Sequence, residues 1–202
     1  MTSTDPKRSG TATQARGEER LDAIRQVVLE LVADHGVEGV TIDAVAAVAK
    51  ASKATLYRRW PTKTDLIREA IEMSFGGERP HDPGDQGSLR AELREVVDGA
   101  AEMLRQNRRL IIALLDGAQR DPVVFRLMRQ ETQDSIIDAT QRPMLRAIAR
   151  GEISPEANIN LVAEVALPIL YHRGVWNEPI DDRFVDHLLD DILMPLARNP
   201  RP

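Results

Sequence analysis

The stretch of residues 41–66, TIDAVAAVAKASKATLYRRWPTKTDL, most constrains this chain, because it favours two short helices joined by a tight turn. Thr41 can cap a helix whose apolar residues recur at helical spacing. Ser52 can cap a second helix that begins at Lys53 and stops before Pro61. About three residues separate the two, which predicts a helix-turn-helix: the first helix braces and the second enters the major groove of DNA.

A third helix is predicted after Thr62, where Asp65 three residues later resembles a capping box. This places Lys63 at a helix N-terminus, where backbone N–H groups and an ammonium suit a phosphate.

Positive charge gathers in the same segment. Residues 41–64 carry five cations against one acid, a net charge of +4, whereas the whole chain carries −5. Residues 1–75 contain 11 basic and 11 acidic side chains, so the acidic excess lies in residues 76–202. A solvated helix face would also explain a cation cluster, but caps, turn and cations in this order favour a polyanion-binding segment.

The composition excludes several classes of protein and of metal site. There is no cysteine, so disulfides and thiolate metal sites are excluded, and no cofactor is predicted. The longest apolar run, residues 165–171, is far shorter than the ~18 residues of a membrane span. The first residues form no apolar signal-peptide core, so we expect a cytoplasmic protein that does not bind membranes.

The rest of the sequence predicts helices, and no segment alternates apolar and polar residues as a β-strand does. We expect a disordered arm over 1–17, a helix-turn-helix domain over 18–75 with its first helix at 18–35, and a linker loop over 76–87. Residues 88–202 should form a helical domain, with helices from Ser88, around 110–118, from Asp121 with a kink or break at Pro143, from 154–155, and from Asp181. The predicted fold class is all-α.

Residues 21–75 resemble the N-terminal domain of the TetR family of bacterial transcriptional regulators, most specifically in SKATLYRRWPTKTDL. GSLRAEL, RDP, ARGEI and the proline-interrupted helix before Trp176 resemble the C-terminal domain of one TetR subgroup. The chain departs from the family at Lys50, where Gly is common, and at Ala51, where Val is common. If the backbone turns as in the family, Lys50 adopts a left-handed or otherwise unfavourable conformation at a cost of about 1 kcal/mol. The alternatives are a slightly reshaped turn or an added phosphate contact from Lys50.

The resemblance and the side-chain chemistry together divide the DNA contacts. Thr41, Thr55, Tyr57 and Lys63 are expected to hold phosphates, and Ser52, Lys53, Ala54 and Arg58 to reach base edges, with Arg59 suited to either role. Core packing is the alternative for Tyr57 and is the favoured reading for Trp60.

The acidic C-terminal part resembles an inducer-binding domain. Its candidate pocket residues, for each of which core packing is individually the favoured interpretation, are Met103, Leu104, Leu114, Phe125, Met128, Ile136, Leu167, Tyr171 and Trp176. The candidate residues of a four-helix dimer interface are Val162, Ala166, Leu170, Val185, Leu188, Leu189, Ile192, Leu193 and Leu196. The alternative for the last helix is that it closes the core of a single chain.

The predicted function is a ligand-responsive repressor that binds a palindromic operator as a homodimer and takes a largely apolar inducer. An activator, or a regulator without a small-molecule inducer, remains open because both share the same DNA chemistry. A metal-dependent enzyme built on His172, His187, Asp186, Asp190 and Asp191 is the remote alternative, since no catalytic motif accompanies those residues and no metal site is predicted.

Overall fold

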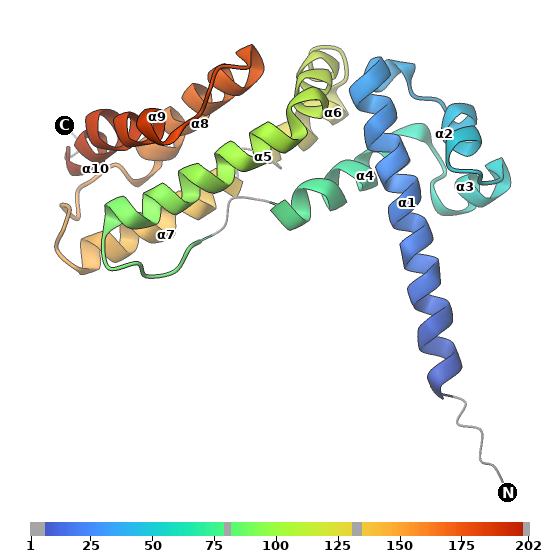
Figure 1. Cartoon of the computed structure of the whole chain (residues 1–202), viewed down its shortest axis with the longest axis horizontal. Coiled ribbons are helices and arrows are strands. Elements are labelled where there is room, and N and C mark those ends of the chain that lie inside the picture. The colour runs from blue at the N-terminus through green and yellow to red at the C-terminus, as the bar shows by residue number, and fades with distance from the viewer. Residues whose placement is uncertain (1–6, 79–81, 131–134, 200–202) are drawn as a thin grey trace, which may run out of the picture.

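The computed structural model describes residues 7–78, 82–130 and 135–199, and within these ranges every regular element is a helix (Figure 1). The first four helices form what we call the reading head: α1 (Lys7–Gly39), α2 (Ile42–Val48), α3 (Lys53–Arg59) and α4 (Lys63–Glu78). The all-α prediction is confirmed.

The predicted caps form the ends of the head helices. The Thr41 hydroxyl accepts from the Ala44 N–H at 3.1 Å, and the Ser52 hydroxyl accepts from the Thr55 N–H at 3.1 Å. The Asp65 carboxylate accepts from the Thr62 N–H at 3.2 Å, while the Asp65 N–H donates to the Thr62 hydroxyl at 3.1 Å. Each side chain satisfies an N–H that a helix start leaves unpaired, so the sequence itself fixes where α2, α3 and α4 begin.

The ends of the head differ from the prediction. Helix α1 begins at Lys7, so residues 7–17 are helical rather than a disordered arm, and the first half of α1 projects away from the other helices (Figure 1). Residues 7–39 contain no proline, and Ala12 and Ala15 favour helix, so the sequence allows α1 to begin soon after Pro6. Gly36 has φ 73° and breaks the helical path within α1, as a capping glycine does.

The body comprises α5 (Leu89–Ala118), α6 (Pro122–Arg129), α7 (Ser135–Ala149), α8 (Ile159–Trp176) and a C-terminal rod. The rod is α9 (Asp182–His187), a π-helical turn over Leu188–Leu193, and α10 (Met194–Arg198). Helices α5 and α7 lie side by side, and α8 and the rod lie at the end of the molecule far from α2 and α3 (Figure 1). No helix within the described residues has the length and apolar character to cross a bilayer.

Several predicted body boundaries were wrong. The two helices predicted from Ser88 and around 110–118 are joined as α5, Leu89–Ala118, with a kink between them at Asn107 (φ −108°, ψ 15°), so that prediction holds apart from the join. Pro143 lies inside α7 without ending it, because Met144 and Ala147 anchor the helix in the core. Helix α8 begins at Ile159, since residues 154–157 close a turn first. The cap at Asp181 is confirmed by its 2.9 Å hydrogen bond from the Phe184 N–H.

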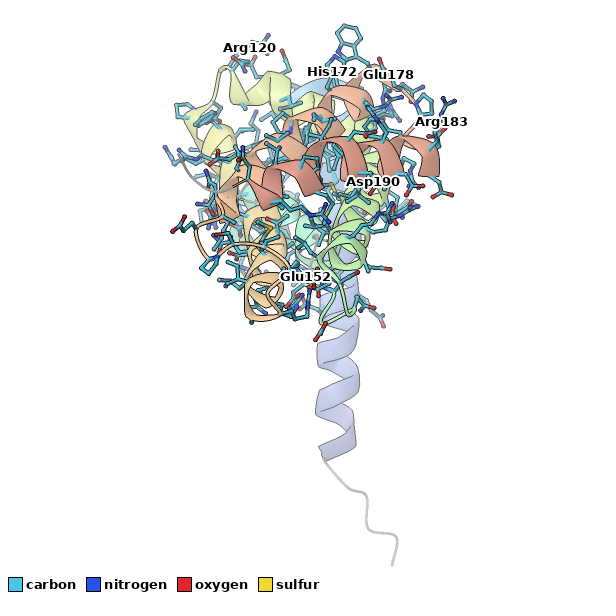
Figure 2. The ribbon with its side chains drawn as sticks, turned by 90° about the vertical axis from the view of Figure 1, so that its left-hand side faces the viewer. Arg120, Glu152, His172, Glu178, Arg183 and Asp190 are labelled. Atoms are coloured by element: carbon cyan, nitrogen blue, oxygen red, sulfur yellow. The ribbon has the colours of Figure 1, made fainter. Side chains whose placement is uncertain are left out.

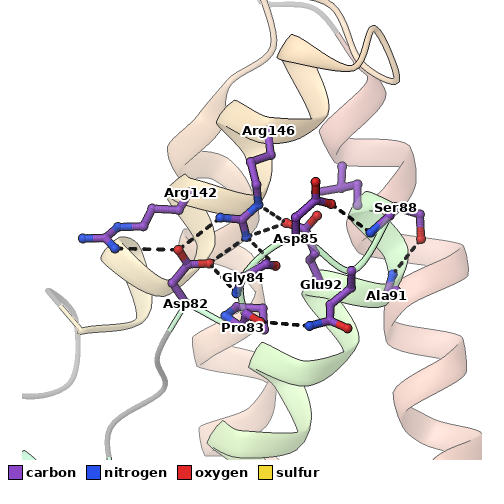
Figure 3. A network of polar contacts seen from close by, with 12 residues as sticks. Asp82, Pro83, Gly84, Asp85, Ser88, Ala91, Glu92, Arg142 and Arg146 are labelled. Atoms are coloured by element: carbon purple, nitrogen blue, oxygen red, sulfur yellow. Dashed lines mark hydrogen bonds and ion pairs between the residues drawn. The ribbon is translucent and has the colours of Figure 1, made fainter.

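A polar network, which we call the clamp, attaches the connection between head and body to α7 (Figure 3). The predicted linker started at residue 76, but α4 continues to Glu78, and the described loop is residues 82–87. Arg146 donates to both Asp82 oxygens at 2.6 and 3.0 Å and to the Gly84 carbonyl at 2.9 Å. It also bonds Glu92, which is fully buried, at 2.7 Å. The second half of the loop is therefore part of the body.

Candidate nucleic-acid interface

The turn between α2 and α3 has the expected geometry. Lys50 has φ 49°, in the left-handed region, so the sequence expectation for this residue is confirmed. The Ala51 N–H donates to the Ala46 carbonyl at 3.0 Å, and Arg20 donates to the Lys50 carbonyl at 3.0 Å. These two bonds tie down the turn and offset the conformational cost of a residue with a Cβ there.

Helix α3 sorts its side chains by face. Leu56 is fully buried and Trp60, which follows the helix, is 2% exposed, so both belong to the head core as predicted. Tyr57 is 51% exposed, and Lys53, Ala54, Arg58 and Arg59 are exposed as well. The structure thus brings the predicted base-reading residues onto one outward face, with the Ser52 cap at its beginning. A helix that presents donors in this way has the dimensions to enter a major groove.

Three of the predicted DNA-binding cations have partners within the chain. Lys53 Nζ lies 2.8 Å from Asp43, and this hydrogen bond raises the pKa of the Lys53 ammonium. Arg59 donates to Glu69 at 3.0 Å. Lys63 Nζ lies 3.3 Å from the carbonyl oxygens of Val37 and of Glu38, at the end of α1. The Lys53–Asp43 pair is exposed on both sides, and such a surface contact is weak and can be exchanged for a phosphate, whereas the Glu69 partner of Arg59 is only 18% exposed.

The hydroxyl groups are also engaged. Thr41 and Ser52 accept backbone N–H groups as caps, and the Ser52 and Thr55 hydroxyl oxygens lie 2.8 Å apart. Each hydroxyl has a second lone pair or a proton for another partner. Among the predicted cations, Arg58 is exposed and has no hydrogen-bond or ion-pair partner within the described part of the chain, so all of its N–H donors are available to an external acceptor.

A groove in the body contains part of the predicted pocket. It has a volume of about 520 Å³ and is lined by Leu115, Ala118, Gln119, Phe125, Met128, Arg129, Leu167, Pro168 and Tyr171. Four predicted residues are among them. Met103, Leu104 and Leu114 are instead buried in the core, and Trp176 is 69% exposed at the end of α8. Ile136 lies outside the residues whose side chains are described.

The predicted dimer interface needs a correction. Seven of its nine residues, all except Ile192 and Leu196, are at most 2% exposed within the single chain, so their side chains cannot meet a second copy. They close the core of the chain, which was the alternative open from the sequence. The outer surface of α8 carries other apolar side chains, including the half-buried Leu161 and Val165 and the exposed Pro168. Figure 2 views the molecule from this end.

The residues considered for a metal site do not converge. Asp186 and Asp190 accept hydrogen bonds from Arg90 at 2.7 Å each, and His187 pairs with Asp191 at 2.6 Å. His172 lies on α8, near Trp176 (Figure 2). No cluster of three or more metal-ligating side chains occurs among the residues that the structure describes.

Comparison with known proteins places these features in a family. Residues 24–70 match the family described as bacterial regulatory proteins, tetR family, and residues 83–192 match the tetracyclin repressor-like C-terminal domain. The second match alone spans more than half of the chain. The chain belongs to the TetR family. It is a DNA-binding transcriptional regulator.

Relatives cover nearly the whole of this TetR-family chain. A DNA-binding transcriptional repressor TetR of Mycobacteroides abscessus is 33% identical over 192 residues, which are 91% of this chain and 97% of that protein. A helix-turn-helix transcriptional regulator of Mycobacterium tuberculosis is 33% identical over 84% of this chain and 83% of its own length. The Salmonella enterica GusR structure shares the fold, with a TM-score of 0.74, 19% identity, and coverage of 90% of this chain and 96% of that one.

Sequence reasoning missed the acids that contact the head cations in this TetR-family regulator. Asp43 was counted only as the single acid of its segment, and Glu69 was not considered at all. Asp43 precedes Lys53 by ten residues, and Glu69 follows Arg59 by ten, too far for a pairing within one helix. Only the tertiary structure brings them together: α2 contacts α3, and Glu69 of α4 reaches the end of α3.

Proposed function

We propose that this TetR-family regulator represses transcription by binding a palindromic operator as a homodimer, and that a largely apolar small molecule releases it. The observation that carries the proposal is the outward face of α3, where exposed cations and a tyrosine stand on a chain that is otherwise acidic. The relative named a repressor, identical at 33% of positions, supports repression as the outcome. A regulator of this kind acts where chromosomal DNA lies, so we also propose the cytoplasm.

Two heads are needed because one helix reads only a few base pairs. We infer that the second copy packs on the outer surface of α8 and the rod, through Leu161, Val165, Ile192 and Leu196. All four are half-buried in the single chain, so each retains apolar surface to cover, unlike the seven core residues. A palindrome whose half-sites lie about 35 Å apart, one turn of DNA, is matched by two heads related by a two-fold axis.

The inducer is proposed to occupy the groove beside α6. Its walls are mainly apolar, Met128 among them is adaptable, and Gln119 and Arg129 supply polar groups, which fits an apolar molecule with an anionic or polar end. Helix α6 also packs against α4 of the head. We propose that the ligand binds more tightly to the arrangement of α6 and α4 in which the two heads are wrongly spaced for DNA. This difference in ligand affinity between the two arrangements is what lowers the affinity for the operator.

The experiment for DNA binding is selection of bound fragments from random duplex DNA. We expect a palindromic site, with affinity that falls steeply as salt increases. The variant Arg58→Ala should weaken binding to the selected site by ten-fold or more, an amount consistent with about 1–3 kcal/mol for one base contact. Enrichment of no site over the starting pool would rule out the proposed function.

Dimerisation and induction have separate tests. Val165→Arg should convert the protein to monomers in sedimentation velocity and abolish binding to the palindrome, while far-ultraviolet circular dichroism stays unchanged.

The apolar anion 1-anilinonaphthalene-8-sulfonate serves as a probe of the groove. Its fluorescence should rise with the parent protein and not with Ala118→Phe, a variant that fills the groove. A fully monomeric parent protein contradicts the dimer, and equal fluorescence for both proteins contradicts the groove.

A further inference from the structure

Glu69 lies at the junction of three head elements. Its Oε1 accepts from Arg25 of α1 at 2.8 Å and from Arg59 of α3 at 3.0 Å, and its Oε2 accepts from the Trp60 indole N–H at 2.9 Å. Its side chain is 18% exposed, and that of Arg25 is 7% exposed. Arg25 is held further by Asp22 at 2.5 Å. Glu69 therefore joins α1 and α4 to the end of the helix that faces DNA.

The charge on Glu69 persists at neutral pH. Burial raises the pKa of this carboxyl, but the hydrogen bonds from Arg25 and Trp60 and the charge of Arg59 outweigh burial and leave the pKa below its ordinary value. Glu69 is therefore an anion that attracts two guanidinium groups.

Arg59 is held on two sides. Besides its ion pair with Glu69, its guanidinium carbon lies 5.7 Å from the centre of the Trp60 ring, within the range of a cation–π contact. Its neighbour Arg58 is exposed and has no such partner among the described residues. Two adjacent arginines of the same helix are thus in opposite states: one is restrained against α4 and the other is available.

We propose that Glu69 is a specificity-determining positioning residue for DNA binding, which keeps Arg59 off the phosphates and fixes the end of α3. The inference rests on the proposed function. Each phosphate contact adds affinity for every sequence, so an arginine released to the backbone strengthens binding to all DNA and lowers the preference for the operator. Glu69 increases the preference for the operator over other DNA, because it limits the sequence-independent attraction between the head and the phosphates.

The central variant is Glu69→Gln, which keeps the shape of the side chain and an oxygen that accepts from the Trp60 indole, but removes the charge. Binding is measured by fluorescence anisotropy on the selected operator and on a scrambled duplex at several salt concentrations. We expect tighter binding to the scrambled duplex and a several-fold lower ratio of the two affinities. The plot of log affinity against log salt should become steeper by about 0.9, the value for one added phosphate contact.

The matched control is Glu72→Gln, one turn along the same helix. It makes the same change in net charge but releases only Arg68, which lies on α4 and keeps its 3.4 Å contact with Asp65. For this variant we expect the slope of log affinity against log salt to equal that of the parent protein. Equal steepening in both variants would mean that net charge alone acts, and the proposal would be overturned.

Two further variants identify Arg59 as the released group. Adding Arg59→Gln to Glu69→Gln should restore the parent slope. Arg59→Gln alone should leave the slope unchanged, because Arg59 is already held off the phosphates; a slope flatter by about 0.9 would overturn the proposal even if the Glu69 variant failed to fold.

A purely structural role for Glu69 predicts a different pattern. Binding to both duplexes would weaken without a steeper slope, and Trp60 fluorescence, followed in a Trp176→Phe background, would shift toward that of an exposed indole. That result would overturn the proposal but leave the proposed function standing. If the parent protein preferred no duplex, the proposed function itself would fail, and the measurement on the parent alone would reveal it.

Discussion

The outer face of the reading head and the clamp of the body both pair cations with carboxylates, but at different depths. Beside α3, the Lys53 and Asp43 side chains are 59% and 68% exposed. In the clamp, Glu92 is fully buried and pairs with Arg146 (Figure 3) and with Arg150. An exposed pair contributes about 0–1 kcal/mol and is easily exchanged, whereas a buried carboxylate depends on its partners. Lys53 can therefore exchange Asp43 for a DNA phosphate, whereas the buried Glu92 helps to hold the loop of residues 82–87 against α7.

The largest test of this contrast is removal of the buried carboxylate. Glu92→Ala leaves Arg146 and Arg150 without their shared partner and should lower the free energy of unfolding by about 3 kcal/mol in urea titration. Glu95→Ala, an exposed position on the same helix, is the control and should change it by less than about 0.5 kcal/mol. Similar values for the two variants would show that the clamp contributes little.

The contact between head and body gives the next largest effect. A Cβ added at Gly117 of α5 would lie 2.7 Å from Val37 Cγ2 at the end of α1, so Gly117→Ala forces the two regions apart. We expect a loss of about 1–3 kcal/mol in unfolding free energy from this overpacking. Gly99→Ala on the same helix meets nothing within 4 Å and should stabilise by about 0.5–1 kcal/mol.

A double-mutant cycle sharpens that result. The cost of Gly117→Ala should fall when Val37 is shortened to Ala, because the added methyl then has room. Strict additivity of the two changes would locate the strain elsewhere.

The sequence predicted the head better than the body for a physical reason. Caps such as Thr41, Ser52 and Thr62 act on N–H groups two or three residues away, so their effect can be read locally. The family resemblance added the left-handed turn at Lys50. The partners of the cations, in contrast, depend on how α2 and α4 pack on α3, which no local pattern contains.

In the body, the same local reasoning failed where tertiary packing decides. Pro143 does not break α7, because the helix is held along the body by the core and by the clamp, whose partners Asp82 and Arg146 are 64 residues apart. The apolar face of the rod was assigned to a second copy, although Leu188 and Leu193 are fully buried within one chain. Periodicity shows that a face is apolar but not which surface covers it.

The exposed cations of the head should show the opposite behaviour to Glu92. Lys53→Ala and Lys63→Ala are each expected to leave the melting temperature almost unchanged, since surface pairs contribute little to stability. Their effects on DNA should differ. Lys63→Ala should weaken binding to all duplexes and flatten the salt dependence by about 0.9, while Lys53→Ala should change the preference among operators. An equal loss on every sequence for both variants contradicts this division.

The smallest expected effect lies in the pH dependence of the ion pairs that join the rod to α5. Hydrogen bonds from Arg90 hold the pKa of Asp190 below its ordinary value. Because the folded pKa is lower than the unfolded value of about 4, the stabilisation is complete above pH 4 and is lost as the pH falls through the folded pKa. Asp190→Asn should lower the melting temperature slightly at pH 7 and by less at pH 3, with exposed Glu95→Gln as the control. A decrease of the same size at both pH values would show that the Arg90 pair does not depend on the Asp190 charge.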